Sequence, residues 1–228
     1  MTKYYSFLTG ILVFFTGCFA SLPPKISDEY LNNKTSEEST KLEVIEKQII
    51  DISNNKEELE KASKITDLKL AVMKKELSQF EAEEALLIDK QRLYVTQNDT
   101  KMQEEVKGEI EKNKKDQAAA KLKLEYMKAK QKDLKNKIDV NEAELSMKVA
   151  EKYYEQAKIG KSNQDKLMGA PANEKDAKNR INVADYEKYF NDQKEYLSRE
   201  QKDQAESELK LKEAEKKLKD AGVIIDII

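Results

Sequence analysis

The sequence predicts an all-α protein: an elongated antiparallel helical bundle, or coiled-coil hairpin, of about three long helices. Of the 228 residues, 38% are charged, with 42 Lys+Arg against 44 Asp+Glu, which exceeds the ~25% of ordinary globular proteins. Glycine and proline interrupt helices, and the chain has only 6 and 3 of them. Apolar residues recur at helical spacing along most of the chain, which is the primary signal for amphipathic helices.

The first helix is expected at about residues 36–96. Thr35 and Glu38 have the spacing of a capping box at its start. Heptad steps then trace a seam in which ten of fourteen positions are apolar, as in a coiled coil. These positions are Leu42, Ile45, Ile49, Ile52, Lys56, Leu59, Ser63, Thr66, Leu70, Met73, Leu77, Phe80, Glu84 and Leu87.

The second helix is expected at about residues 100–159, after a turn at residues 97–99. Thr100 and Gln103 repeat the capping-box spacing, and one continuous helix through residue 98 is the alternative. Gly160 is predicted to end this helix, because glycine tolerates the left-handed conformation of a C′ residue. Its apolar stripe is Met102, Val106, Ile110, Leu124, Met127, Leu134, Ile138, Leu145, Val149, Tyr153 and Ala157.

A loop at residues 160–173 precedes a third helix at about residues 174–221, which Gly222 closes. Short connections between long helices favour an antiparallel arrangement, in a helical domain that covers residues 35–222. Eight pairs place Glu four residues before Lys, the order that stabilises helices by ~0.2–0.5 kcal/mol per pair. The pairs are Glu43/Lys47, Glu57/Lys61, Glu60/Lys64, Glu111/Lys115, Glu144/Lys148, Glu206/Lys210, Glu208/Lys212 and Glu213/Lys217.

Residues 1–17 have the pattern of an export signal. Lys3 precedes a nine-residue apolar segment at residues 7–15, which is shorter than the ~20 residues of a membrane-spanning helix. Residues 18–34 contain Pro23-Pro24, and are therefore expected to form an extended tether.

The segment Phe15-Thr16-Gly17-Cys18 resembles a bacterial lipobox, and the preference for Lys over Arg is similar to that of spirochaete lipoproteins. The resemblance implies cleavage by signal peptidase II and lipidation of Cys18. It also implies a membrane-anchored lipoprotein of the bacterial cell envelope, with the outer membrane as its expected location. The alternative is that Cys18 belongs to an ordinary signal or an uncleaved anchor.

The composition argues against an enzyme. The chain has no histidine and one cysteine, which excludes Ser-His-Asp machinery, His-ligated zinc and thiolate zinc cages. No catalytic residue, cofactor site or metal site is therefore predicted. A formal net charge of −2 makes nucleic acid an unexpected partner.

Two weak motifs have simpler structural explanations. Gly160-Lys161-Ser162 matches the end of a P-loop, but Glu155 occupies the position of its first glycine. The acidic run at Glu81, Glu83 and Glu84 would fan out around a helix instead of converging on a cation. The prediction for this run is a solvated helix face.

Two apolar groups leave alternatives open. The first is aromatic and forms either core or a patch for a protein partner: Tyr153, Tyr154, Tyr186, Tyr189, Phe190 and Tyr196. The second is the β-prone tail at residues 223–228, which either folds over the bundle end or docks on a partner's sheet edge. Its candidate docking residues are Val223, Ile224, Ile225, Ile227 and Ile228.

These observations predict a lipid-anchored envelope protein with a structural or protein-interaction role, such as a scaffold, a bridge or a surface-presenting rod. The membrane, through the lipid on Cys18, and one or more proteins are its expected partners, with a homo-oligomer as one form. The alternative is a periplasmic holdase chaperone with helical arms, or a transport adaptor.

Overall fold

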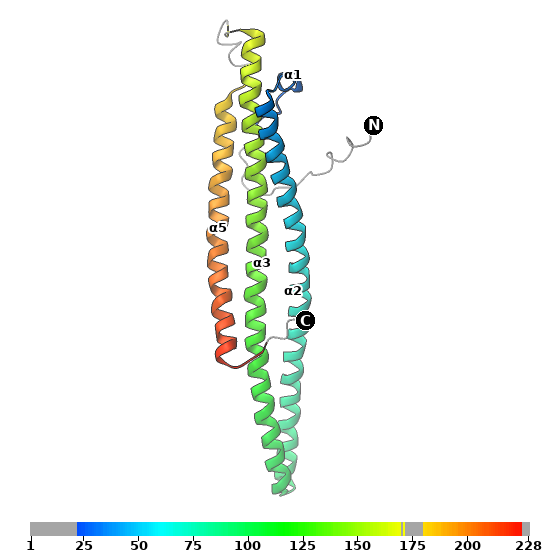
Figure 1. Cartoon of the computed structure of the whole chain (residues 1–228). Coiled ribbons are helices and arrows are strands. Elements are labelled where there is room, and N and C mark those ends of the chain that lie inside the picture. Colours follow the sequence, from blue (N-terminus) through cyan, green and yellow to red (C-terminus); the bar gives the residue numbers. More distant parts are fainter. Residues whose placement is uncertain (1–21, 170, 172–179, 225–228) are drawn as a thin grey trace, which may run out of the picture. The chain divides into compact units, whose positions relative to one another are not determined.

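The computed structural model describes residues 22–169, 171 and 180–224. Of these, 89% are helical, and no strand occurs among them, so the predicted all-α helical bundle is confirmed (Figure 1). The helices are α1 (Asp28–Leu31), α2 (Ser36–Thr96), α3 (Thr100–Met168) and α5 (Val183–Asp220). They belong to two compact units: unit 1 combines Met1–Leu42 with Ala150–Asp192, and unit 2 combines Glu43–Val149 with Gln193–Ile228.

Helix α2 has the bounds that the sequence predicts, and its capping box is present. The backbone N–H of Thr35 donates to Glu38 Oε2 at 2.7 Å, and the N–H of Glu38 donates to Thr35 Oγ1 at 3.2 Å. Each side chain thus satisfies a backbone donor that the first helical turn leaves without a partner.

The turn between α2 and α3 is also present, so the alternative of one continuous helix is wrong. Asn98 has a φ of 56°, and the N–H groups of Asn98 and Asp99 donate to the carbonyls of Val95 and Tyr94, the pattern of a Schellman motif. The expected cap at Thr100 is wrong by one residue. Asp99 caps α3 instead, because its Oδ1 accepts from the N–H of Met102 at 3.1 Å.

The predicted end of the second helix at Gly160 is wrong, and so is the first part of the predicted loop. Helix α3 continues through Gly160 to Met168, and the residue with a left-handed φ of 68° is Gly169. Helix α5 begins at Val183, because Arg180, Ile181 and Asn182 are non-helical, and the predicted start of the third helix near residue 174 lies outside the described residues. Gly222 closes α5 as predicted, with a φ of 66°.

In unit 2, the α2 seam packs against α3. All fourteen predicted seam positions of α2, including the first in unit 1, are buried or half-buried, which confirms the heptad register. Leu70 packs with Leu124 and Met127 of α3, and Leu87 packs with Val106 and Ile110.

Buried polar side chains of α3 fix its register against both neighbours in unit 2. Towards α2, the Asn113 amide donates to Glu83 at 3.0 Å. Towards α5, the Asn136 amide donates to the Asp203 carbonyl at 2.9 Å, and the Ser207 hydroxyl donates to Asp133. Polar groups at helix interfaces favour the one alignment that satisfies their hydrogen bonds.

In unit 1, residues 22–34 pack on α3 and α5, so the expectation of an extended tether is wrong for this described part. Ile26 and Leu31 are 4% and 8% exposed. The Tyr186 hydroxyl donates to the Pro24 carbonyl at 2.5 Å, and the Asn163 amide donates to the Tyr30 carbonyl at 2.9 Å. We call residues 22–34 the docked segment.

Gly160 allows the docked segment to approach α3 closely. A Cβ atom at Gly160 would lie 2.8 Å from Ile26 Cγ2 and 3.0 Å from Ile181 Cδ1. Both distances are shorter than ordinary carbon–carbon contacts of ~3.5–4.0 Å. Packing therefore explains this glycine, whereas the end of a helix does not.

Candidate interaction surface on helix α2

A stripe of large apolar side chains lies exposed along the part of α2 that belongs to unit 2. The stripe residues are between 52% and 70% exposed: Ile65, Leu68, Val72, Leu86 and Leu93. Single exposed apolar residues are normal on protein surfaces. An aligned series of them is typical of an interaction site.

The stripe follows the same heptad as the seam. Ile65, Val72, Leu86 and Leu93 occupy the third position of their heptads, with Gln79 filling the same position between Val72 and Leu86. Because these positions repeat every seven residues, they stay aligned along a supercoiled helix. The geometry therefore suits contact with another long helix.

The stripe points away from α3. The third and sixth positions of a heptad lie on roughly the opposite side of a helix from the first and fourth, and the latter form the seam with α3. The described contacts of α5 in unit 2 reach α3, at Glu125, Asp133 and Asn136, and Figure 1 shows α3 between α2 and α5 there.

The predicted site residues at the chain ends have different outcomes. Cys18 with the signal at residues 1–17, and Ile225, Ile227 and Ile228 of the tail, lie outside the described residues. Val223 is half-buried and its N–H donates to the Leu218 carbonyl. Ile224 is 76% exposed.

Two members of the acidic run, Glu83 and Glu84, contribute to helix pairing in unit 2, and Glu81 is exposed. Glu83 accepts from the Asn113 amide, and Glu84 accepts from the Gln117 amide at 2.7 Å. The described residues contain no group of three or more acidic or cysteine side chains placed to hold a metal ion.

The Gly160-Lys161-Ser162 motif lies in the interior of α3, where backbone N–H groups are engaged in the helix. Lys161 forms a hydrogen-bonded ion pair with Asp165. The hydrogen bond from Lys161 and the charge of the nearby Arg180 hold the pKa of Asp165 below its ordinary value. A P-loop requires a strand, a loop and a following helix. This motif therefore has a structural role.

Two of the aromatic candidates are buried in unit 1, and two others are half-buried and stack on each other. Tyr186 and Tyr189 are 3% and 8% exposed, and burial raises the pKa of both hydroxyls. Tyr154 stacks on Phe190 with ring centroids 5.9 Å apart. The core interpretation is confirmed for Tyr186 and Tyr189, so an exposed stripe through Tyr186 is wrong.

An ion pair beside this core joins two helices of unit 1. Lys41 of α2 lies 2.9 Å from Glu155 of α3, which also pairs with Lys158. Burial disfavours the charged form of Glu155, but the hydrogen bonds from Lys158 and Lys41 outweigh it and hold its pKa below the ordinary value.

The stripe was missed in the prediction from sequence, although a signal for it exists. The apolar residues that fall two positions after the first seam position of a heptad form a second periodic series. This second series becomes visible when the apolar residues outside the main seam are aligned by heptad.

No protein-family model, no curated protein and no solved structure matches the chain. Among the described residues, no helix carries an apolar stretch of the length that a membrane crossing requires.

Proposed function

We propose that this chain is a lipid-anchored protein of the bacterial cell envelope with a structural or protein-interaction role and no catalytic activity. In this proposal Cys18 carries the lipid, and the helical body binds one or more proteins, copies of itself included. The lipobox-like segment at residues 15–18 supports the anchor. The stripe on α2 supports the interaction role.

The stripe is the observation that carries the interaction role. In a chain with 38% charged residues, five large apolar side chains on one exposed helix face cost solubility without contributing to the described core. Burial of each such side chain against a partner contributes ~1.5–3 kcal/mol. The heptad spacing favours a helical partner over a flat surface.

A holdase chaperone or a transport adaptor is the second candidate. An exposed apolar stripe also suits transient contact with unfolded chains, which present apolar segments of many sequences. The two functions differ in their partners, since a scaffold has a fixed partner and a holdase has many unfolded clients.

The anchor is tested by Cys18→Ala in the native host. We expect the wild-type chain to incorporate labelled fatty acid and to enter the detergent phase of Triton X-114. The variant should not incorporate labelled fatty acid and should not enter the detergent phase as a lipoprotein. It should remain a larger, uncleaved precursor or be cut at another residue. A wild-type chain whose mature N-terminus is a residue other than Cys18 would overturn the lipoprotein proposal.

The interaction role is tested by the double variant Leu68→Glu, Val72→Glu. Lys47→Glu is the matched control, because Lys47 is exposed on the same helix outside the stripe. Cross-linking in cells followed by mass spectrometry should recover a fixed protein or a second copy with wild type and control, but not with the double variant. Recovery of many unrelated proteins would favour the holdase, and equal recovery from all three chains would exclude the stripe.

A further inference from the structure

The stripe on α2 has its centre at Gln79. The third heptad position holds two large apolar residues on each side of this glutamine, seven and fourteen positions away: Ile65, Val72, Leu86 and Leu93. Gln79 is exposed, as the stripe residues are. The third position of the heptad before Ile65 holds Glu58, and α2 ends at Thr96, before the position that follows Leu93. The exposed series therefore has the same pattern of apolar and polar residues in both directions along the helix.

The charges along this part of α2 change sign at the same residue. Residues 64–78 contain four lysines and two acidic residues, which gives this half a net charge of +2. Residues 80–94 contain two basic and four acidic residues, which gives this half a net charge of −2. Complementary charges favour the association of two surfaces, and like charges oppose it. The two halves are therefore complementary to each other.

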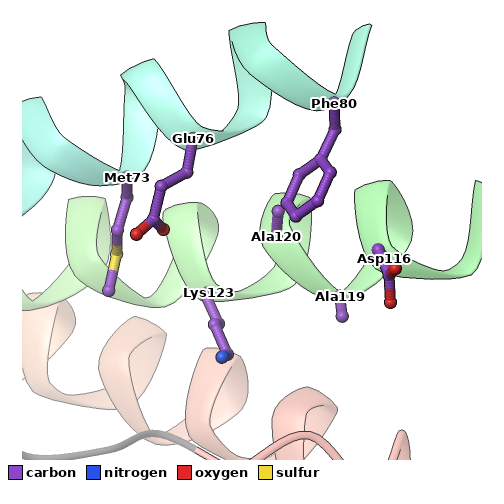
Figure 2. A pocket seen from close by; sticks show the side chains of 7 residues that line it. All are labelled: Met73, Glu76, Phe80, Asp116, Ala119, Ala120 and Lys123. Carbon is purple, nitrogen blue, oxygen red and sulfur yellow. The ribbon is translucent and has the colours of Figure 1, made fainter. Parts of the chain in front are cut away.

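The stripe lies on a different face of α2 from the hollow that α2 forms with α3. Met73 and Phe80 line this hollow, and Figure 2 shows both side chains extending from α2 towards α3. Val72 and Gln79 each precede one of them by one position, which is about 100° around a helix. Both Val72 and Gln79 are exposed. A partner can therefore reach the centre of the stripe without displacing the contacts between α2 and α3.

Helix α5 leaves the second half of the stripe without a third helix. Lys217, near the end of α5, pairs with Glu125 of α3, and the adjacent Leu124 packs on Leu70 of α2. The end of α5 is therefore close to the level of Leu70, and Figure 1 shows α2 and α3 continuing together beyond it. The described contacts of α2 with other helices beyond this level reach α3.

We propose that the stripe binds a second copy of this chain, with the two α2 helices antiparallel and related by a twofold axis at Gln79. The proposal rests on the interaction role proposed above for the stripe, and it names the partner. A twofold dimer uses the same surface of both chains, and this surface is complementary to its own reversed copy. Helices α2 and α3 of both chains then form a four-helix bundle.

The antiparallel direction follows from the charges. A parallel pair would place the basic half of each α2 beside the basic half of the other copy, and the acidic halves beside each other. The antiparallel pair places each basic half beside an acidic half, with Ile65 level with Leu93 of the second copy and Val72 level with Leu86 of the second copy. At the axis, the Gln79 amides of the two copies meet, and each amide both donates and accepts hydrogen bonds.

Cysteine cross-linking in the purified full chain tests the partner. Cys18→Ser removes the only native cysteine. Gln79→Cys should form disulfide-linked dimers under mild oxidation, because position 79 lies beside its own copy at the axis. Glu81→Cys is the matched control, because Glu81 is exposed almost level with Gln79 on the side of α2 away from the stripe. We expect Gln79→Cys to form the linked dimer at least ~10-fold faster than Glu81→Cys.

Two further positions test the direction. Positions 65 and 93 are 28 residues apart, so an antiparallel pair separates each of them from its own copy by about 42 Å, far beyond the ~7 Å that a disulfide allows. Ile65→Cys and Leu93→Cys should therefore form no linked dimer when each is oxidised alone, and should form one when the two chains are mixed. Self-linked dimers of both single variants would indicate a parallel pair and would overturn the proposal. Equal rates for Gln79→Cys and Glu81→Cys would also overturn it.

Sedimentation velocity of the Cys18→Ser chain measures the association itself. We expect a dimer, and the double variant Val72→Glu, Leu86→Glu should sediment as a monomer with unchanged helix content. A chain that is monomeric without these two substitutions would overturn the proposal. If that monomeric chain still captures a different protein in cells through the stripe, the proposed interaction role stands and only the identity of the partner is wrong.

Discussion

Replacement of Gly160 by alanine gives the sharpest test of how unit 1 is built. A methyl group at this position would lie 2.8 Å from Ile26 Cγ2 and 3.0 Å from Ile181 Cδ1. The Ile181 atom ends a flexible side chain and can move, whereas Ile26 Cγ2 is held by the docked segment. Gly108, in the same helix, has nothing within 4 Å of the corresponding position and is the matched control.

The expected magnitudes follow from two opposing effects. Glycine to alanine in a helix interior stabilises by ~1 kcal/mol, and Gly108→Ala should show this gain alone. Inserting a methyl group into a packed site costs ~1–3 kcal/mol, so Gly160→Ala should range from neutral to ~2 kcal/mol less stable than wild type. The two alanine variants should therefore differ by ~1–3 kcal/mol, or roughly 2–12 °C in melting temperature.

Thermal unfolding followed by circular dichroism measures this difference, and hydrogen exchange locates it. In Gly160→Ala, the amides of the docked segment should exchange faster, because Ile26 must move away from α3. In Gly108→Ala, they should exchange at the wild-type rate. If both variants gain the same stability and exchange in the docked segment does not change, the proposed reason for Gly160 is wrong.

Other predictions address the seam, the cap and the ion pair of unit 1. Leu70 is 7% exposed, so Leu70→Ala should lower the free energy of unfolding by ~2–5 kcal/mol. Leu68 is 70% exposed, so Leu68→Ala should change the free energy of unfolding by less than ~0.5 kcal/mol. Similar melting temperatures for the two variants would mean that the register is wrong. Thr35→Ala should cost ~1 kcal/mol, whereas Thr35→Ser should retain wild-type stability in the same melting assay. Because the pKa of Glu155 is lowered in the folded protein, its contribution is present above the unfolded-state pKa and is lost as pH falls through the folded-state pKa. Glu155→Gln should therefore be less stable than wild type at about pH 7, with the difference disappearing in melts at about pH 2; a difference that does not depend on pH would exclude the ion pair as its cause.

Local signals explain the parts of the fold that could be predicted from the sequence. The capping box at Thr35, the turn at Asn98 and the closure at Gly222 each depend on residues within one helical turn. The seam of α2 depends only on its heptad spacing. All of these features occur in the structure because tertiary contacts reinforce the local preference.

The misplaced helix end at Gly160 has a long-range cause. Its neighbour Ile26 is more than a hundred residues away in the sequence, and a glycine required for close packing looks the same as a glycine that ends a helix. The docked segment was predicted to be extended because Pro23 and Pro24 dominate its beginning. Its apolar residues Ile26, Tyr30 and Leu31 were the available signal that it packs on the rest of the chain.

The heptad spacing of the stripe is present in the sequence, but the exposure of the stripe could be established only with the structure. Apolar residues off the seam at the level of α5, such as Ile65 and Val72, could have been covered by a third helix in a closed bundle. In the structure, α5 packs on α3, and the stripe of α2 is left exposed. The polar contacts of Asn136 and Asp133 with α5 favour this placement of the third helix, and such partners cannot be identified from spacing alone.

The docked segment also determines how many residues would separate a membrane anchor at Cys18 from the folded part of the chain. Tyr186 holds the carbonyl of Pro24, only six residues after Cys18, and six extended residues reach at most about 20 Å. For a chain anchored at Cys18, the Pro24 contact of unit 1 would then lie within about 20 Å of the lipidated residue. Release of the docked segment would lengthen the maximum distance between Cys18 and the capping box to about 60 Å. The free energy with which residues 22–34 dock would therefore decide how far from the membrane the helices can reach.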